Sequence, residues 1–310
     1  MNKLLAFVIL LGIGFSSLAQ PSIQAFSPQT FKDLPNVRDL AISPDGNEMY
    51  FSVQSVRQDF TAIMVSHKTK KDWGSPHIAS FSGQYKDIEP FLSQDGLTLY
   101  FASSRPVKGR ETENSNYDIW KVQRKSLDSE WSEPVNLGVP VNTEADEFYP
   151  SVAASGNLYF TAQREGTKGK EDIFISRFEN GSYQEPESLP EAIDSQGYEF
   201  NAFVAPDESY ILFTGYGRED GMGGGDLYIS RKNDKGEWLA AAHLEAPINS
   251  KGLDYCPYVH NNQLYLTSNR SALQTYYEKP LTTDELLEEL NKNENGKSRI
   301  YQVIGNWLSR

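Results

Sequence analysis

One sequence pattern occurs five times along the chain, and this periodicity constrains the fold more than any other feature. A short apolar and aromatic stretch recurs as Met49-Tyr50-Phe51, Leu99-Tyr100-Phe101, Leu158-Tyr159-Phe160, Ile211-Leu212-Phe213 and Leu264-Tyr265-Leu266. The middle residues of these stretches are 50, 59, 53 and 53 positions apart. Periods of roughly 20 to 50 residues are typical of repeat architectures, in which stacked units bury a continuous core.

Each repeat is predicted to contain four short strands, called a, b, c and d in sequence order, and the apolar stretch is strand b. Turns that supply the positive φ of tight hairpins precede strand b, so strand a lies before each turn. These turns are Pro44-Asp45-Gly46, Gln94-Asp95-Gly96, Ala154-Ser155-Gly156, Pro206-Asp207-Glu208 and Asn261-Asn262. Strand c follows at Ala62-Ile63-Met64, Asp118-Ile119-Trp120, Asp172-Ile173-Phe174, Asp226-Leu227-Tyr228 and Arg299-Ile300-Tyr301. Strand d is marked by Trp73 with Pro76, Trp131 with Pro134, Tyr183 with Pro186, and Trp238.

Five such units predict an all-β fold, a five-bladed β-propeller of four-stranded antiparallel blades, with a six-bladed ring as the alternative. Ring closure covers the apolar face that each blade would otherwise expose. A single domain over residues 20–310 is expected, with repeats at residues 37–83, 84–140, 141–192, 193–248 and 249–310. Because the sequence ends too soon after the last strand c for a full strand d, we expect residues 22–33 to complete the last blade.

The repeat resembles a known family. The succession acidic-x-x-Pro, Asp-Gly, Leu-Tyr-Phe, Ser-x-Arg and Asp-Ile-Trp resembles the WD40-like β-propeller repeat of TolB-like proteins, and it covers nearly all of the sequence after the leader. The resemblance implies an exported scaffold of the bacterial cell envelope that binds other proteins and carries no chemistry on the propeller itself. The sequence departs from the family in having five repeats instead of six, and in lacking a separate N-terminal domain.

The first residues have the pattern of a secretion signal. Asn2 and Lys3 lead into an apolar run over residues 4–15, which ends at the small-x-small sequence Ser17-Leu18-Ala19. We therefore expect residues 1–19 to be cleaved and the protein to be periplasmic or secreted. No cysteine follows the run to carry a lipid anchor, and no later stretch approaches the roughly 20 apolar residues of a membrane helix.

Charge and cysteine content narrow the range of partners and cofactors. The protein has 310 residues, with 29 Lys and Arg against 42 Asp and Glu, for a net charge of −13. This balance argues against nucleic acid or an anionic membrane surface as the partner. The single cysteine, Cys256, excludes a disulfide framework and a cysteine-based metal site. We expect a monomer that binds a protein or glycan of the cell envelope and has no cofactor. The sequence leaves open whether a cation binds at the mouth of the central channel.

The connections between strands b and c are long and irregular, whereas those between strands a and b are tight. The b–c and d–a connections lie on the same rim of the propeller, which we call the long-loop rim. We expect binding on this rim, because ligand sites are commonly carried on long loops of a rigid scaffold. Strand a begins near an acidic residue in four repeats: Asp87, Glu147, Glu199 and Asp254. If strand a lines the channel, these carboxylates converge at its mouth and bind a cation or a basic side chain of a partner. The alternative is that each one caps loop N–H groups or pairs with a basic residue of the neighbouring blade.

An arginine follows strand b in the same four repeats, and three of these arginines precede an aspartate that starts strand c. The predicted structural pairs are Arg105 with Asp118, Arg164 with Asp172, and Arg218 with Asp226. Arg270 has no aspartate at the start of its strand c, so we expect it to be free for a ligand. Tyr198 and Tyr255 are further candidates on this rim, where their rings could stack on a sugar or simply pack.

The last b–c connection holds the one clear helix signal, a capping box of Thr282 and Glu285 followed by Leu286, Leu287 and Leu290. We expect this helix to pack over the rim or over the edge of the last blade.

Catalytic motifs are absent from the sequence, so an enzyme is the less favoured interpretation. The alternative function is a carbohydrate-active hydrolase that uses the rim carboxylates, because glycosidases place two carboxyl groups about 5 to 9.5 Å apart in an open pocket. Carboxylates held in salt bridges would favour the scaffold.

Overall fold

A computed structural model describes residues 21–107 and 116–308. The expected leader, residues 1–19, lies outside the described residues. In the part of the protein that is described, no helix combines the length and the apolar character needed to cross a bilayer.

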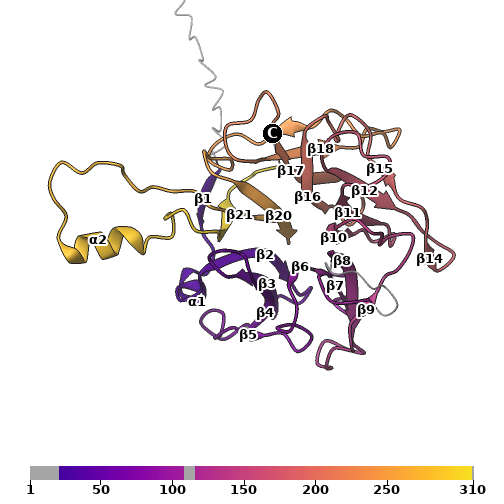
Figure 1. Ribbon diagram of the computed structural model, residues 1–310, viewed down its shortest axis with the longest axis horizontal. Coiled ribbons are helices and arrows are strands. Elements are labelled where there is room, and N and C mark those ends of the chain that lie inside the picture. Colours follow the sequence, from indigo (N-terminus) through magenta and orange to yellow (C-terminus); the bar gives the residue numbers. More distant parts are fainter. Residues whose placement is uncertain (1–20, 108–115, 309–310) are drawn as a thin grey trace, which may run out of the picture.

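The strands form five four-stranded antiparallel sheets arranged around a central axis, which confirms the five-bladed propeller (Figure 1). Blade one contains β2 (Asn36–Ile42), β3 (Glu48–Gln54), β4 (Thr61–His67) and β5 (His77–Ile78). Blade two contains β6 (Asp87–Leu92), β7 (Thr98–Ser103), β8 (Asp118–Gln123) and β9 (Val135–Asn136). Blade three contains β10 (Glu147–Val152), β11 (Leu158–Ala162), β12 (Asp172–Ser176) and β15 (Glu187–Ser188). Blade four contains β16 (Tyr198–Val204), β17 (Tyr210–Tyr216), β18 (Asp226–Arg231) and β19 (Ala242–His243).

Blade five joins the two ends of the described sequence. It consists of β20 (Asp254–His260), β21 (Gln263–Ser268), β22 (Arg299–Ile304) and, as its outer strand, β1 (Ser22–Ala25). The register of β1 on β22 runs from Ser22 opposite Ile304 to Ala25 opposite Tyr301. The ring is therefore closed by backbone hydrogen bonds between the first and the last strands.

The repeated aromatic stretch is buried because both faces of each blade are covered by neighbouring blades. Its last residue is fully buried in four of the repeats, at Phe51, Phe101, Phe160 and Phe213, and its counterpart Leu266 is 1% exposed. Burying each such side chain contributes about 1.5–3 kcal/mol. This packing explains why strand b is a continuous apolar run instead of an alternating one.

In blades one to four the outer strand is only two residues long. Three of them, β5, β9 and β15, begin directly after a proline, at Pro76, Pro134 and Pro186 respectively. Proline has no N–H to donate and is tolerated at the edge of a sheet, so it limits how far the outer strand pairs. A hairpin of β13 (Phe178–Glu179) and β14 (Ser182–Tyr183), which the sequence did not indicate, extends from blade three.

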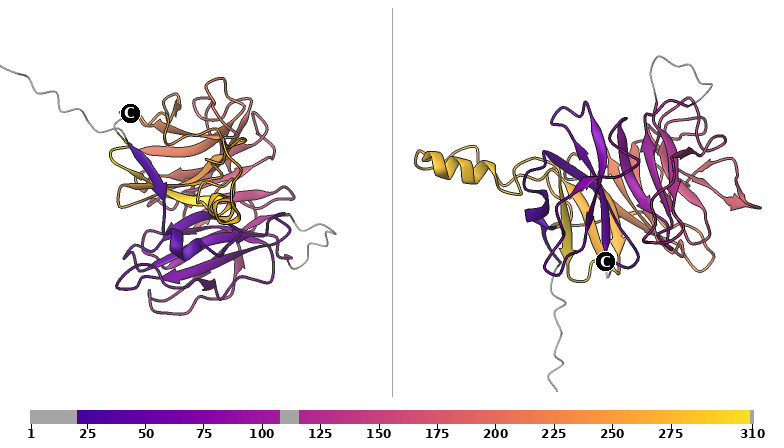
Figure 2. Two further views of the ribbon diagram at one scale, coloured as in Figure 1. Left: turned by 90° about the vertical axis from the view of Figure 1, so that its left-hand side faces the viewer. Right: turned by 90° about the horizontal axis from the view of Figure 1, so that it is seen from below.

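Two helices are present among the described residues, the short α1 (Pro28–Phe31) and α2 (Thr283–Leu290). The capping box of α2 is formed as predicted, but the expected packing against the rim is wrong. None of the α2 residues is buried, and Leu286, Leu287 and Leu290 are about half exposed. Figures 1 and 2 show α2 on an arm that projects from blade five, because the long connection between β21 and β22 carries it away from the body.

Candidate functional site

The first strand of every blade contains a β-bulge, which interrupts its pairing with the second strand at equivalent places in all five blades. One residue in each bulge has a positive φ between 48° and 62°, and these residues are Asp39, Glu89, Tyr149, Asn201 and Cys256. This conformation is uncommon outside glycine, and a bulge turns the side chain away from the regular alternation of a strand. The five residues thus take up equivalent positions on the innermost strands.

Hydrogen bonds link these residues across the central channel, although they come from different blades. The Cys256 Sγ donates to Asp39 Oδ1 at 2.8 Å, and Asn201 Nδ2 lies 3.4 Å from Glu89 Oε1. The Tyr149 hydroxyl donates to the carbonyl of Pro257 at 3.1 Å. All five are buried, so the channel is filled at this level by a polar network.

Arg38 is the cation at the centre of this network. Its Nε donates to Asp39 Oδ1 at 2.7 Å and its Nη2 to Glu89 Oε1 at 2.8 Å, so it pairs with carboxylates of two blades. Its guanidinium also lies 5.0 Å from the centre of the Tyr255 ring. Burial opposes the charge of Arg38, but the neighbouring Asp39 and Glu89 outweigh it, and the pKa of Arg38 is raised above its ordinary value.

Glu89 has a structural partner that explains why an acid stands at this position. In three blades the N–H of the bulge residue donates to a hydroxyl on strand b of the preceding blade, namely Thr267 for Asp39, Ser52 for Glu89 and Thr161 for Asn201. Blade two has Ala102 at the corresponding place. The N–H of Tyr149 donates instead to Glu89 Oε2 at 2.7 Å, so this carboxylate replaces the missing hydroxyl.

A pocket of about 280 Å³ opens above this network on the long-loop rim. Its charged wall residues are Arg38, Glu89 and Glu171, and its polar wall residues are Gln54, Gln58, Thr161 and Asn201. Apolar and aromatic side chains complete the wall: Ile88, Phe148, Phe200, Leu253 and Tyr255. The pocket can therefore offer charge, hydrogen bonds and aromatic surface to one ligand.

The two carboxylates of the pocket differ in their protein contacts. Burial raises the pKa of Glu89 to about 7, with the Arg38 guanidinium opposing the rise and Asp39 adding to it. Burial and the charge of Asp146 raise the pKa of Glu171 above its ordinary value. Among the described residues no side chain pairs with the Glu171 carboxylate, which leaves it available to a ligand.

The four predicted rim acids lie at the start of strand a, but their carboxylates are inside the blades and do not line the pocket. Asp87, Glu147, Glu199 and Asp254 are all fully buried. Each accepts a hydrogen bond from a hydroxyl of the preceding d–a loop: Ser82, Thr143, Ser195 and Ser250, respectively. Because these acids stand before the bulge, their side chains follow the regular alternation and point away from the channel.

Three of the four arginines pair with the rim acid of their own blade. Arg105 Nη2 lies 2.7 Å from Asp87 Oδ1, Arg218 Nη2 lies 2.9 Å from Glu199 Oε1, and Arg270 Nη2 lies 2.7 Å from Asp254 Oδ1. This differs from the expected pairs of Arg105 with Asp118 and of Arg218 with Asp226, and Arg270 is buried instead of free. Strand b is hydrogen-bonded to strand a through the residues just before the arginine, which brings the rim acid within its reach.

Arg164 is the exception among these arginines. It donates to the carbonyls of Pro140 and Val141 and lies 3.4 Å from Glu185, and none of these bonds involves its expected partner Asp172.

The aspartates that start strand c bind local donors. Asp172 accepts from the N–H groups of Lys168 and Gly169, and Asp226 accepts from those of Met222 and Gly223. Asp118 accepts from the side-chain amides of Asn116 and Asn136. These aspartates therefore fix the long loops in place.

The two predicted tyrosines have different surroundings. Tyr255 is 5% exposed and forms part of the pocket wall, where Arg38 covers its ring. Tyr198 is 37% exposed and packs near Tyr216, with ring centres 5.8 Å apart, outside the pocket wall. Only Tyr255 is thus placed to contact a ligand in the channel mouth.

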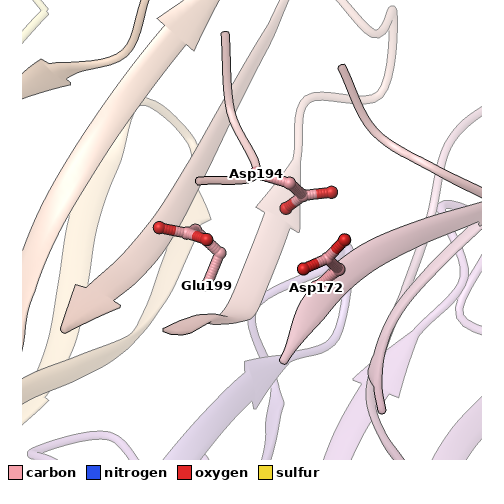
Figure 3. Close-up of side chains that lie close together, drawn as sticks. All are labelled: Asp172, Asp194 and Glu199. Carbon is pink, nitrogen blue, oxygen red and sulfur yellow. The ribbon is translucent and has the colours of Figure 1, made fainter. Parts of the chain in front are cut away.

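Three carboxylates come together near blade three, and Figure 3 shows Asp172, Asp194 and Glu199 side by side. Each offers one oxygen, and these oxygens all lie within 4.8 Å of one another. Protein donors already bind the group, among them the Ile173 N–H on Asp194 and the Arg218 guanidinium on Glu199. Burial raises the pKa of Asp194 to about 8, with nearby Asp172 adding to the rise. A neutral Asp194 removes the charge repulsion, so the geometry does not require a metal.

The pocket residues Arg38, Glu89, Phe148, Glu171 and Phe200 were not identified from the sequence. A signal was present, since the position two residues after each rim acid carries Glu89, Tyr149, Asn201 or Cys256. These side chains are chemically different, so the position does not stand out as a recurring element of the repeat.

No protein-family model and no curated protein matches the sequence. Solved structures share its fold. TolB from Acinetobacter baumannii aligns with 88% of this protein at 15% identity and a TM-score of 0.46, and the aligned part spans 56% of TolB.

Two other similar structures align over nearly their full length. A structure described as a BT0996 RGII complex aligns with 91% of this protein and 96% of its own length, at 9% identity and a TM-score of 0.54. A glycoside hydrolase aligns with 89% of this protein and 90% of its own length, also at 9% identity and a TM-score of 0.54. At these identities the likeness shows the propeller fold alone, which is the fold implied by the resemblance to TolB-like repeats.

Proposed function

We propose that this protein is an exported binding module that engages a protein or glycan of the cell envelope at the mouth of its central channel. The observation that carries the proposal is the 280 Å³ pocket on the long-loop rim, which combines charged, amide and aromatic side chains. Ligand sites are typically concave and mostly apolar with a few converging polar groups. The pocket is concave, combines apolar and aromatic walls with polar groups that converge on it, and lies on the rim expected to bind.

The state of the rim acids supports binding over hydrolysis. Asp87, Glu199 and Asp254 are held in salt bridges, and Glu147 is held by hydrogen bonds from Thr143. A hydrolytic pair would need two carboxyl groups free to act on either side of a scissile bond. The contacts of these four acids are therefore made within the protein, where they stabilise the blades and their loops.

Site-specific photocrosslinking in the living cell tests the proposal. A photoreactive phenylalanine analogue replaces Gln58, an exposed residue at the edge of the pocket, and in a matched control it replaces Asn262 on the opposite rim. Both residues have φ near 61°, so the substitution strains the backbone equally. We expect a discrete crosslinked product from position 58 and none from position 262, and mass spectrometry will identify it as protein or glycan. Equal products at both positions, or none at position 58, would rule out the pocket as the binding site.

The alternative, a carbohydrate-active hydrolase, is favoured by one observation, the presence of Glu89 in the pocket with a pKa raised to about 7. A carboxyl group with such a pKa can act as a general acid near neutral pH. Incubation with envelope polysaccharides and chromatography of the products tests this function. Release of sugars that Glu89→Gln abolishes would establish the hydrolase, whereas no release by the wild type leaves the binding module.

A further inference from the structure

We infer that the pocket at the channel mouth receives a lysine or arginine side chain presented by a partner protein. The inference rests on the proposed function and assigns the chemistry of the ligand. It starts from the charges around the pocket: Arg38 is the one cationic side chain among the described residues of its wall, against the carboxylates of Glu89 and Glu171. Asp39, which lies beneath Arg38, adds a third acidic group.

The positive charge of Arg38 is already compensated by salt bridges within the protein. Its guanidinium contacts Asp39 at 2.7 Å and Glu89 at 2.8 Å, and both of these acids are buried. The second oxygen of Asp39 is buried without any hydrogen-bond donor among the described residues. The acidic groups therefore outnumber the compensating cation, and an anionic ligand would have to displace carboxylates that Arg38 holds at short distance.

Glu171 supplies the contact that a cation needs. Its carboxylate lies in the pocket wall, is partly buried and makes no ion pair or hydrogen bond within the described part of the protein. An ammonium or guanidinium group placed there gains a charge-assisted hydrogen bond in a partly desolvated setting.

The aromatic residues of the wall suit the remainder of such a side chain. Phe148 and Phe200 are partly exposed, and Tyr255 already has one guanidinium over its ring. Aromatic faces attract cations, and the methylene groups of Lys or Arg bury well against apolar surface. A metal ion fits less well, because the one group of three acidic side chains with metal-ligating geometry among the described residues lies elsewhere, at Asp172, Asp194 and Glu199.

Ligand-observed NMR titration with three capped tripeptides tests the inference. The central residue is lysine, arginine or norleucine, and norleucine matches the aliphatic length of lysine without its charge. The protein variants are wild type, Glu171→Gln and the control Glu179→Gln, which removes an equal charge from the exposed β13–β14 hairpin. Thermal unfolding of each variant verifies that it is folded.

We expect the two cationic peptides to bind at least about tenfold more tightly than the norleucine peptide. We expect Glu171→Gln to reduce that preference several-fold, Glu179→Gln to preserve it, and added salt to weaken it. Equal binding of all three peptides, or a cation preference unchanged in Glu171→Gln, would overturn the inference. In that case a crosslink from position 58 would still uphold the pocket as a binding site, so the failures of the two proposals are distinguishable.

Discussion

Asp194 occupies a position that asparagine holds in two other blades. Asn142 and Asn249 each accept from a backbone N–H and donate back to the carbonyl of the same residue of strand c. Asp194 accepts from the N–H of Ile173 in the same way, but a carboxylate has no proton with which to donate. Burial raises its pKa to about 8, so near neutral pH the acid is protonated and, like the amide, has a hydrogen to donate.

This protonation makes stability depend on pH. The unfolded pKa is about 3.9, so the folded state binds an extra proton between roughly pH 4 and 8, and stability falls as pH rises through that range. We expect Asp194→Asn to remove this loss and to add on the order of 1–3 kcal/mol at pH 8. Thermal unfolding of the wild type, Asp194→Asn and the exposed control Asp234→Asn from pH 4 to 9 measures this pH-dependent gain in stability. A gain of equal size at every pH would contradict the assigned protonation.

The bulges of the first strands each need an acceptor for one backbone N–H, and blade two shows what happens when the usual hydroxyl is missing. Glu89 accepts the Tyr149 N–H because Ala102 cannot. Glu89→Ala should therefore cost about 1–3 kcal/mol by leaving a buried donor unpaired. Adding Ala102→Ser to that variant should recover about 1 kcal/mol by restoring the hydroxyl found in the other blades.

Urea unfolding of the two single variants and the double variant measures this coupling. The loss of the Arg38–Glu89 contact is common to both backgrounds that lack Glu89, so it cancels in the comparison. If Ala102→Ser has the same effect with and without Glu89, the carboxylate does not replace the hydroxyl.

The sequence predicts the three inner strands of each blade well because they are marked by buried apolar stretches next to turns of distinctive composition, whereas the two-residue outer strands β5, β9, β15 and β19 lie at exposed or half-buried positions. It does not predict the site well, because a single bulge residue reverses which side chains face the channel. Asp87 and Glu89 illustrate this. Asp87 belongs to the acidic position that recurs in the repeats, but its carboxylate lies inside the blade. Glu89, two positions later, is the acid that lines the pocket at the channel mouth. The arginine pairs were misassigned because sequence proximity to strand c does not reveal the closer approach of strand a.

Closure of the whole ring depends on β1, whose four residues pair with β22 across almost the entire length of the sequence. Deleting residues 21–25 would leave β22 with an unpaired edge and lose on the order of 3 kcal/mol, which lowers Tm by roughly 5–10 °C. Calorimetry of the truncated protein measures the loss, and a synthetic peptide of residues 21–34 added in trans should restore part of it. An unchanged Tm would show that the other four blades hold the ring without β1.

The arm that carries α2 enters and leaves the propeller between two strands of the same blade, and β22 beyond it is hydrogen-bonded on both sides, to β21 and to β1. A cut anywhere along the arm would thus yield two polypeptides that stay associated, because the detached C-terminal piece remains sandwiched in its sheet. The same geometry makes the arm a natural point for inserting a label, a tag or a whole foreign module without disturbing the architecture to which it is attached.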